Sequence, residues 1–314
     1  MRPSETLTRQ LRWGLMFLSA LIAMGTAVCR AEQPAGAVAK TAPASQEVEF
    51  RSGDVTLSGT LLVPPNMIAA VVVVHGSGKA RRNILFAQAL VRNGVATLTY
   101  DKRGVGKSAG MSAGLEVGTN NVEPRNLDLL AGDASAAVKD LERRITSPRT
   151  PVGPIGGSPA GWIVPLATAR SPGVKFMILW SGPLVTTREQ LRFQFLTDGK
   201  VDFWDHHSEM EVREHIRSDR DRYPFVATDP VDSLRKLSIP GLWLYGGRDV
   251  YIPVGLSIAR LVVLAASGKP FEHHLFPCCG HNPPFPRALS ASMDWLMKRV
   301  VEVRNGKPQD IPGG

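Results

Sequence analysis

Residues 151–162 read Pro-Val-Gly-Pro-Ile-Gly-Gly-Ser-Pro-Ala-Gly-Trp, an apolar run that ends in a turn of small residues around Ser158. A strand that reverses sharply into a helix, while lifting one side chain clear of the sheet, needs very small residues two positions before and after that side chain. Gly156 and Ala160 meet this need in a G-x-S-x-A pattern. The stretch predicts a strand, a tight turn and a helix, with Ser158 as a candidate nucleophile.

Three other stretches are predicted strands that run into a loop, and the first two have the apolar composition of buried strands. An apolar, mostly β-branched run over 69–74 ends in a His-Gly-Ser-Gly loop, a run over 241–245 is followed by Asp249, and a run over 272–277 leads to His281. Buried parallel strands read as such continuous apolar runs. Serine, aspartate and histidine therefore occur in that order, each just past the carboxyl end of a predicted strand.

A fourth motif lies in the segment from Asp101 to Ser108, which reads D-x-R-G-x-G-x-S. With the serine turn and the order of the three polar residues, it resembles the α/β-hydrolase superfamily, in particular its serine esterases and serine aminopeptidase-like members. The resemblance covers roughly residues 47–302 and leaves 303–314 as a C-terminal tail.

The resemblance implies a role for each matching residue. Ser158 would be the nucleophile, His281 the base that takes its proton, and Asp249 the carboxylate that fixes the imidazole tautomer. The oxyanion donors would come from the loop after the first strand, at Gly76 and Ser77.

Three neighbouring residues are expected to support the loops around the site: His75, Asp101 and Arg103. The segment that ends in Gly-Lys-Ser at Ser108 also resembles the end of a phosphate-binding loop. That motif requires a glycine where this chain has Asp101, so we prefer the supporting role.

Pro159 departs from the superfamily pattern. The residue after the nucleophile normally supplies a second oxyanion N–H, and proline has none. Loss of one such donor typically costs about 10²–10³ in rate. Proline is otherwise well tolerated at the start of a helix. The sequence thus leaves two alternatives, a working serine hydrolase or a catalytically weakened or degenerate hydrolase fold that binds without cleaving.

Alternating strand and helix patterns predict the fold class α/β, with a mostly parallel sheet covered by helices on both faces and ligands at its carboxyl edge. Between residues 186 and 230 the pattern changes to charged and aromatic residues, and we expect a helical lid there. Its aromatic residues suggest an apolar acyl or alcohol group in the substrate. The other expected elements are a hairpin over 48–63 turning at Gly53-Asp54, helices over 85–92, 127–144 and 288–303, and a strand over 174–180.

The amino-terminal 31 residues have the pattern of a secretory signal peptide. Two arginines precede an apolar stretch over 13–28, and small residues near Ala31 suit a signal peptidase. We expect cleavage after Ala31, a disordered tether over 32–46, and export to the periplasm or out of the cell. A retained membrane anchor is the first alternative. A lipoprotein anchored at Cys29 is the weaker one, because a bulky valine precedes that cysteine.

The chain carries a formal net charge of +9, but its basic residues are scattered and no aromatic-interleaved basic stripe occurs. We therefore expect a small-molecule acyl substrate as partner, with no nucleic acid and no membrane span after signal cleavage. The oligomeric state stays open.

A rival interpretation is metal binding by the cluster of His273, His274, Cys278, Cys279 and His281. Adjacent cysteines rarely both reach one tetrahedral ion, and no second C-x-x-C supports them. We therefore expect no metal. After signal cleavage the two remaining cysteines are either free or joined in a strained vicinal disulfide.

The preferred function is hydrolysis of carboxylic esters, or related acyl bonds, through an acyl-enzyme and without a cofactor. Amide hydrolysis of the aminopeptidase kind is a further alternative. It is less favoured because no acidic cluster marks a site for a free amino terminus.

Overall fold

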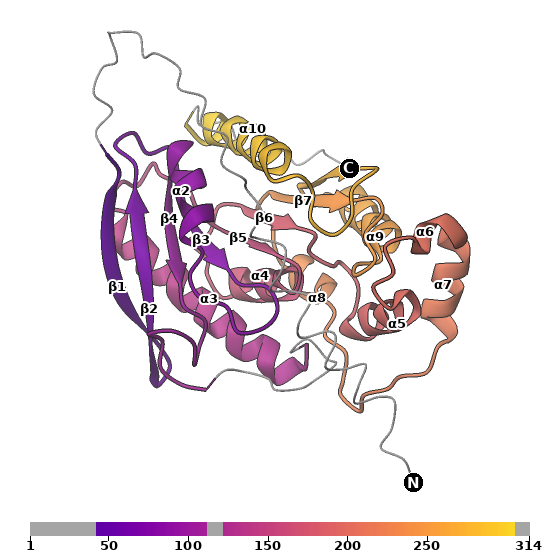
Figure 1. Ribbon diagram of the computed structural model, residues 1–314. Helices are drawn as coiled ribbons and strands as arrows, with labels where there is room; N and C mark the ends of the chain where they lie inside the picture. The colour runs from indigo at the N-terminus through magenta and orange to yellow at the C-terminus, as the bar shows by residue number, and fades with distance from the viewer. Residues whose placement is uncertain (1–41, 112–121, 305–314) are drawn as a thin grey trace, which may run out of the picture.

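The computed structural model describes residues 42–111 and 122–304 (Figure 1). Within them lies an eight-stranded sheet in the order β1-β2-β4-β3-β5-β6-β7-β8. Strands β3 to β8 are parallel, while β1 and β2 are antiparallel to their neighbours, which confirms the predicted, mostly parallel sheet. The strands are β1 (Ala44–Ser52), β2 (Val55–Val63), β3 (Ala69–Val74), β4 (Val95–Tyr100), β5 (Val152–Gly157), β6 (Met177–Trp180), β7 (Gly241–Gly246) and β8 (Phe271–Phe276).

The hairpin of β1 and β2 forms as predicted and turns at Gly53, whose φ of +60° suits glycine. It begins earlier than expected, because Ala44 already pairs with Val63. The end of the predicted tether, residues 44–46, is therefore part of the sheet. In β6 the opposite occurs: ladder pairing begins only at Met177 and not at Val174.

Helices cover both faces of the sheet, as predicted. Side chains of β3 alternate between the faces, since Val71 and Val73 join one apolar core while Val72 and Val74 join the other. The first core packs under α2 and α10, and the second under α3, α4 and α9. The helices of the two layers are α2 (Ile84–Arg92) and α10 (Phe285–Arg304), and α3 (Pro124–Arg144), α4 (Ala160–Ala169) and α9 (Val254–Ala266).

The segment between β6 and β7 is helical, as the sequence suggested, and we call residues 186–230 the insertion. It holds α5 (Thr187–Thr197), α6 (Phe203–His206) and α7 (Glu209–Ser218), and the short α8 (Val231–Leu234) follows it. Capping boxes fix the starts of α5 and α7, with Thr186 paired to Glu189 and Ser208 to Glu211. In Figure 1 these helices gather at one end of the sheet, beside α9.

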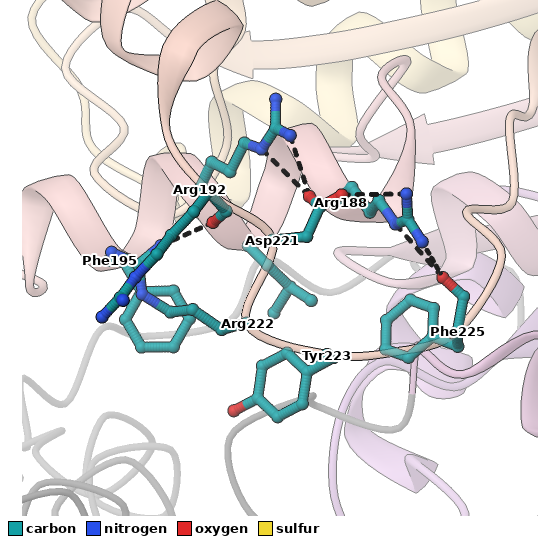
Figure 2. A pocket seen from close by; sticks show the side chains of 9 residues that line it. Arg188, Arg192, Phe195, Asp221, Arg222, Tyr223 and Phe225 are labelled. Atoms are coloured by element: carbon teal, nitrogen blue, oxygen red, sulfur yellow. Dashed lines mark hydrogen bonds and ion pairs between the residues drawn. The ribbon is translucent and has the colours of Figure 1, made fainter.

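The chain that leaves α7 is tied back onto α5 by arginines (Figure 2). Arg188 and Arg192 both form ion pairs with Asp221, at 2.8 and 2.9 Å. Arg222 lies over the ring of Phe195, 4.2 Å from its centre. These contacts join α5 to the segment that follows α7 within the insertion.

The predicted signal peptide, and the tether up to residue 41, lie outside the described residues. Among residues 42–111 and 122–304, no helix is long and apolar enough to cross a membrane.

Candidate active site

Ser158 occupies the tight turn between β5 and α4. Its φ is +53°, a left-handed conformation that costs a non-glycine residue about 1–3 kcal/mol and recurs at functional sites. The surrounding small residues are required by packing. A Cβ on Gly156 would stand 2.6 Å from the Cβ of Ala160 and 2.9 Å from the carbonyl oxygen of Val74. The G-x-S-x-A pattern thus fits a turn that leaves no room for larger side chains.

Pro159 is the residue immediately before α4, with φ −53° and ψ −15°. Its ring is compatible with these angles, and its carbonyl accepts the N–H of Trp162 at 3.1 Å. No N–H is present at this position, so the turn after Ser158 lacks the donor that the superfamily pattern places there.

Asp249 and His281 are hydrogen-bonded to each other across the ends of β7 and β8. The Nδ1 of His281 lies 2.8 Å from Oδ2 of Asp249, and Oδ1 accepts the N–H groups of Tyr251 and Ile252 at 2.7 and 2.9 Å. Asp249 is fully buried. Because a carboxylate only accepts hydrogen bonds, the imidazole proton belongs on Nδ1, and Nε2 is left as a proton acceptor.

The end of β6 connects the serine turn to the histidine loop. The N–H of Ser158 donates to the carbonyl of Trp180 at 3.0 Å, and the hydroxyl of the next residue, Ser181, donates to the carbonyl of His281 at 2.5 Å. Ser181 is itself left-handed, with φ +49°, and buried. The structure therefore brings Ser158, Asp249 and His281 to one edge of the sheet, after the carboxyl ends of β5, β7 and β8, with β6 between the first two.

The loop after β3 lies against the serine turn. A Cβ on Gly76 would be 3.3 Å from the carbonyl oxygen of Gly157 and 3.9 Å from the Cβ of Ser158. Gly76 and Ser77 are therefore placed beside the predicted nucleophile.

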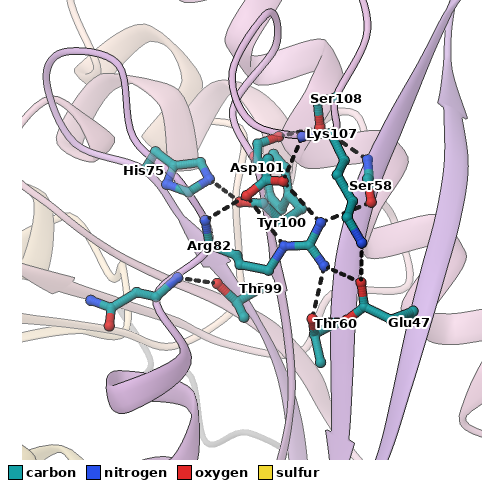
Figure 3. A network of polar contacts seen from close by, with 11 residues as sticks. Glu47, Ser58, Thr60, His75, Arg82, Thr99, Tyr100, Asp101, Lys107 and Ser108 are labelled. Carbon is teal, nitrogen blue, oxygen red and sulfur yellow. Dashed lines mark hydrogen bonds and ion pairs between the residues drawn. The ribbon is translucent and has the colours of Figure 1, made fainter.

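His75 joins this loop to the end of β4. Its Nε2–H donates to the carbonyl of Tyr100 at 2.5 Å, and its ring stands edge-on to the Tyr100 ring (Figure 3). Burial, together with the nearby Lys102 ammonium, lowers the pKa of His75 to about 4 in spite of the hydrogen bond to Tyr100. His75 is thus a neutral donor that fixes the loop.

Asp101 and Arg82 form a buried polar network under the loop (Figure 3). Asp101 accepts the N–H of Lys107 at 3.0 Å, and its ion pair with Arg82 measures 2.9 Å. Burial alone would raise the pKa of Asp101, but hydrogen bonds from Arg82 and Lys107 outweigh it and hold that pKa at about 2. Gly106 is required beside it, because a Cβ there would meet the carboxylate at 2.5 Å.

Arg103 makes a two-point contact with Asp133 of α3, through Nε–Oδ2 at 3.0 Å and Nη2–Oδ1 at 2.5 Å. Both side chains are buried. A planar guanidinium and a carboxylate match in this geometry, which fixes the segment after β4 to the helix layer.

Comparisons with known proteins agree on the fold. The profile of the family described as serine aminopeptidase S33 matches residues 65–205. An esterase from Pyrococcus furiosus has a TM-score of 0.59 at 18% identity and covers 82% of this chain and 90% of its own. The chain therefore has the α/β-hydrolase fold, and part of its sequence matches the serine aminopeptidase family model.

Two other solved structures extend the comparison of the fold. An acylaminoacyl peptidase from Pyrococcus horikoshii has a TM-score of 0.57 at 16% identity, over 87% of this chain and 43% of that one. A dienelactone hydrolase from Anabaena variabilis has a TM-score of 0.52 at 20% identity, over 83% and 98%. At such identities the likeness concerns the fold. No curated protein matches the chain.

The insertion directly contacts the loop after β7 that carries Asp249, which we call the acid loop. The indole N–H of Trp204 donates to the carbonyl of Asp249 at 2.8 Å, and the Thr197 hydroxyl donates to that of Val250 at 2.6 Å. The ring of Tyr251 stands edge-on to His281, 5.3 Å between centres. The insertion therefore holds the loop that positions the Asp-His pair.

Two aromatic residues of the insertion pack inside it and do not face a substrate. Phe193 and Phe203 are buried in the insertion's own core with Val212 and Ile216. Packing of the insertion explains their presence, so they carry no information on the acyl or alcohol group.

The cysteine and histidine cluster does not assemble as the metal interpretation would require. His281 is bonded to Asp249, and both Cys278 and Cys279 are free thiols. In the part of the chain that the structure describes, no group of three or more His, Cys, Asp or Glu side chains is placed to hold a metal ion.

Sequence reasoning missed Ser181, Arg82 and Trp204. Each acts through a contact with a residue at least 19 positions away along the chain, as Arg82 does with Asp101. No local motif marks such contacts, and only the positive φ of Ser181 sets it apart in the fold.

Proposed function

We propose that this α/β-hydrolase is a serine hydrolase that cleaves carboxylic esters, or related acyl bonds, through an acyl-enzyme. The observation that carries the proposal is the hydrogen bond between Asp249 and His281, 2.8 Å long. It leaves Nε2 of the imidazole as a base on the sheet edge that also carries Ser158 in its strained turn.

The mechanism follows from these groups. As Oγ of Ser158 attacks the ester carbonyl carbon, its proton passes to Nε2 of His281, and Asp249 stabilises the imidazolium. The carbonyl oxygen takes the negative charge, and the loop at Gly76 and Ser77 supplies its N–H donors. The tetrahedral intermediate then collapses and the ester C–O bond breaks. The leaving alcohol takes the proton from His281. Water then attacks the carbonyl carbon of the acyl-enzyme, with His281 again as the base. This second step releases the carboxylic acid and restores Ser158.

The test uses a fluorophosphonate probe, which reacts with activated serines, and a short-chain aryl ester. Mass spectrometry should find the probe on Ser158 of the wild-type protein. Ser158→Ala, Asp249→Asn and His281→Ala should each lower kcat by at least about 10³-fold, and the losses should not add because the three groups act as one unit. Ser171→Ala, a change at a buried serine whose hydroxyl is hydrogen-bonded to that of Ser135, is the matched control.

Two other functions are outcomes of the same test. Pro159 favours a degenerate, binding-only domain, and an unlabelled Ser158 with no turnover of any ester would establish it in place of an enzyme. Faster cleavage of an aminoacyl arylamide than of the ester would favour the amide hydrolysis that the family description names.

A further inference from the structure

Lys102, the residue between Asp101 and Arg103, is buried directly behind the loop that follows β3. It is 3% exposed. Its Nζ donates to the carbonyl oxygen of Gly76 at 2.9 Å and to that of Gly78 at 3.0 Å. Lysine is rarely buried unless it has partners, and here both partners belong to one short loop.

The main chain of Lys102 holds the same loop. Its N–H donates to the carbonyl of Ala80 at 3.0 Å, so three carbonyls of the segment 76–80 point at one residue. Gly78 makes this possible, because its φ of +72° turns the loop so that two alternate carbonyls reach one ammonium group.

Holding a carbonyl also fixes the N–H of the same peptide group. The peptide is planar and trans, so the N–H of Ser77 points away from the carbonyl of Gly76. When that carbonyl faces Lys102, the N–H of Ser77 is directed to the opposite side. Gly76 lies against the serine turn, within 3.9 Å of the Ser158 Cβ when its own Cβ is added.

We propose that Lys102 is a positioning residue for the oxyanion loop, whose ammonium group holds the carbonyls of Gly76 and Gly78 and thereby directs the loop N–H groups to the developing oxyanion. This role rests on the proposed serine hydrolase activity. It matters more here than where residue 159 has an N–H, because Pro159 leaves the loop to supply the backbone donors. A hydrogen bond from a charged group also polarises each held peptide and strengthens its N–H as a donor.

The electrostatic surroundings give this role a pH signature. Burial lowers the pKa of Lys102 to about 8, against a weaker opposing effect of Asp133. The other charged or titratable groups around the segment include Asp101 with its partner Arg82, Arg103 with its partner Asp133, and the neutral His75. The ammonium form is therefore lost as the pH rises through about 8, and the oxyanion loop loses its charged anchor there.

The test measures kcat and KM for an aryl ester from pH 6 to 10. In Lys102→Met, kcat should fall by ~10²-fold at pH 7 while KM changes little, because the lost alignment acts on the transition state. Wild-type kcat should decline above about pH 8, and this decline should be absent from Lys102→Met. Lys102→Arg, which stays charged, should retain part of kcat and should also lack the decline. Lys139→Met, at an exposed lysine of α3, is the control and should match the wild type.

Thermal unfolding separates positioning from a purely structural role. Lys102→Met leaves the carbonyls of Gly76 and Gly78 without their donor, so the kinetics are run well below the Tm of each variant, where positioning still predicts the loss of kcat. A variant with normal kcat and lowered Tm would overturn the proposal. If Lys102→Met fails to fold, Lys102→Arg decides, and a decline near pH 8 identical to the wild type would reject the role of Lys102. A wild-type protein with no labelling of Ser158 would instead reject the proposed function itself.

Discussion

The Ser158-Pro159 turn satisfies the packing of the fold but lacks a backbone donor that acyl transfer would use. Packing against Val74 and Ala160 keeps Gly156 small and holds Ser158 left-handed. Pro159 then begins the approach to α4 with angles that suit its ring. The backbone of the turn is therefore compatible with its residues. Pro159, however, has no N–H to donate to the oxygen on which negative charge develops during acyl transfer.

Pro159→Gln should therefore raise kcat by up to about 10²-fold while KM changes less, because the new N–H acts on the transition state. The fold should tolerate it, since proline is accepted but not required before a helix. Steady-state kinetics on an aryl ester, with Tm as the control, checks this. An unchanged kcat in an already fast enzyme would mean that other groups hold the oxyanion.

At the scale of elements, the ends of β3 and β4 are joined by the neutral His75 and its bond to Tyr100. A folded pKa of about 4 lies below the value near 6.5 of an unfolded histidine. Between these values the unfolded chain binds more protons than the folded one. Stability from this residue is therefore fully present above pH 6.5 and falls as the pH drops toward 4.

We expect the free energy of unfolding to decrease by up to about 3 kcal/mol over that interval on account of His75, at 1.36 kcal/mol per pKa unit. His75→Gln should have lower stability at pH 7 and a shallower loss between pH 6.5 and 4. Urea unfolding at several pH values measures both. His206→Gln, at a histidine whose side chain is 70% exposed, is the control. Equal slopes in the wild type and His75→Gln would contradict the assignment.

The sequence predicted elements where local chemistry decides them, and missed boundaries that depend on a partner. The helix over 85–92 was predicted within one residue, because the α2 pattern closes at Asn93 and Gly94. The start of β1 at Ala44 was missed, since it depends on pairing with Val63. The positions of Ser158, Asp249 and His281 after strand ends were predictable because, as for α2, a local sequence pattern marks them. Lys102 and Ser181 were missed because each makes its contact with a distant segment of the chain.

At the scale of the whole molecule, the insertion and the sheet act as one unit at the acid loop. Arg248 of that loop pairs with Asp205 of α6 at 2.5 Å, and Trp204 bonds to Asp249. A movement of the insertion would therefore change the position of the Asp-His pair. We expect the role of this segment as a lid to be coupled to catalysis for that reason.

The compartment of the protein is predicted by its amino-terminal sequence. Arginines ahead of the apolar stretch 13–28, and small residues around Ala31, predict a cleaved secretory signal. Amino-terminal sequencing of the exported protein should then begin near Glu32, about twelve residues before β1 starts at Ala44. Recovery of Met1 or Arg2 from the exported form would contradict cleavage.

The two alternatives have their own outcomes. A full-length protein held in the membrane fraction would favour the retained anchor, and a lipid on Cys29 would favour the lipoprotein. Cleavage near Glu32 would leave a short polar tether on a hydrolase domain whose own helices, within the described ranges, have no membrane-spanning segment.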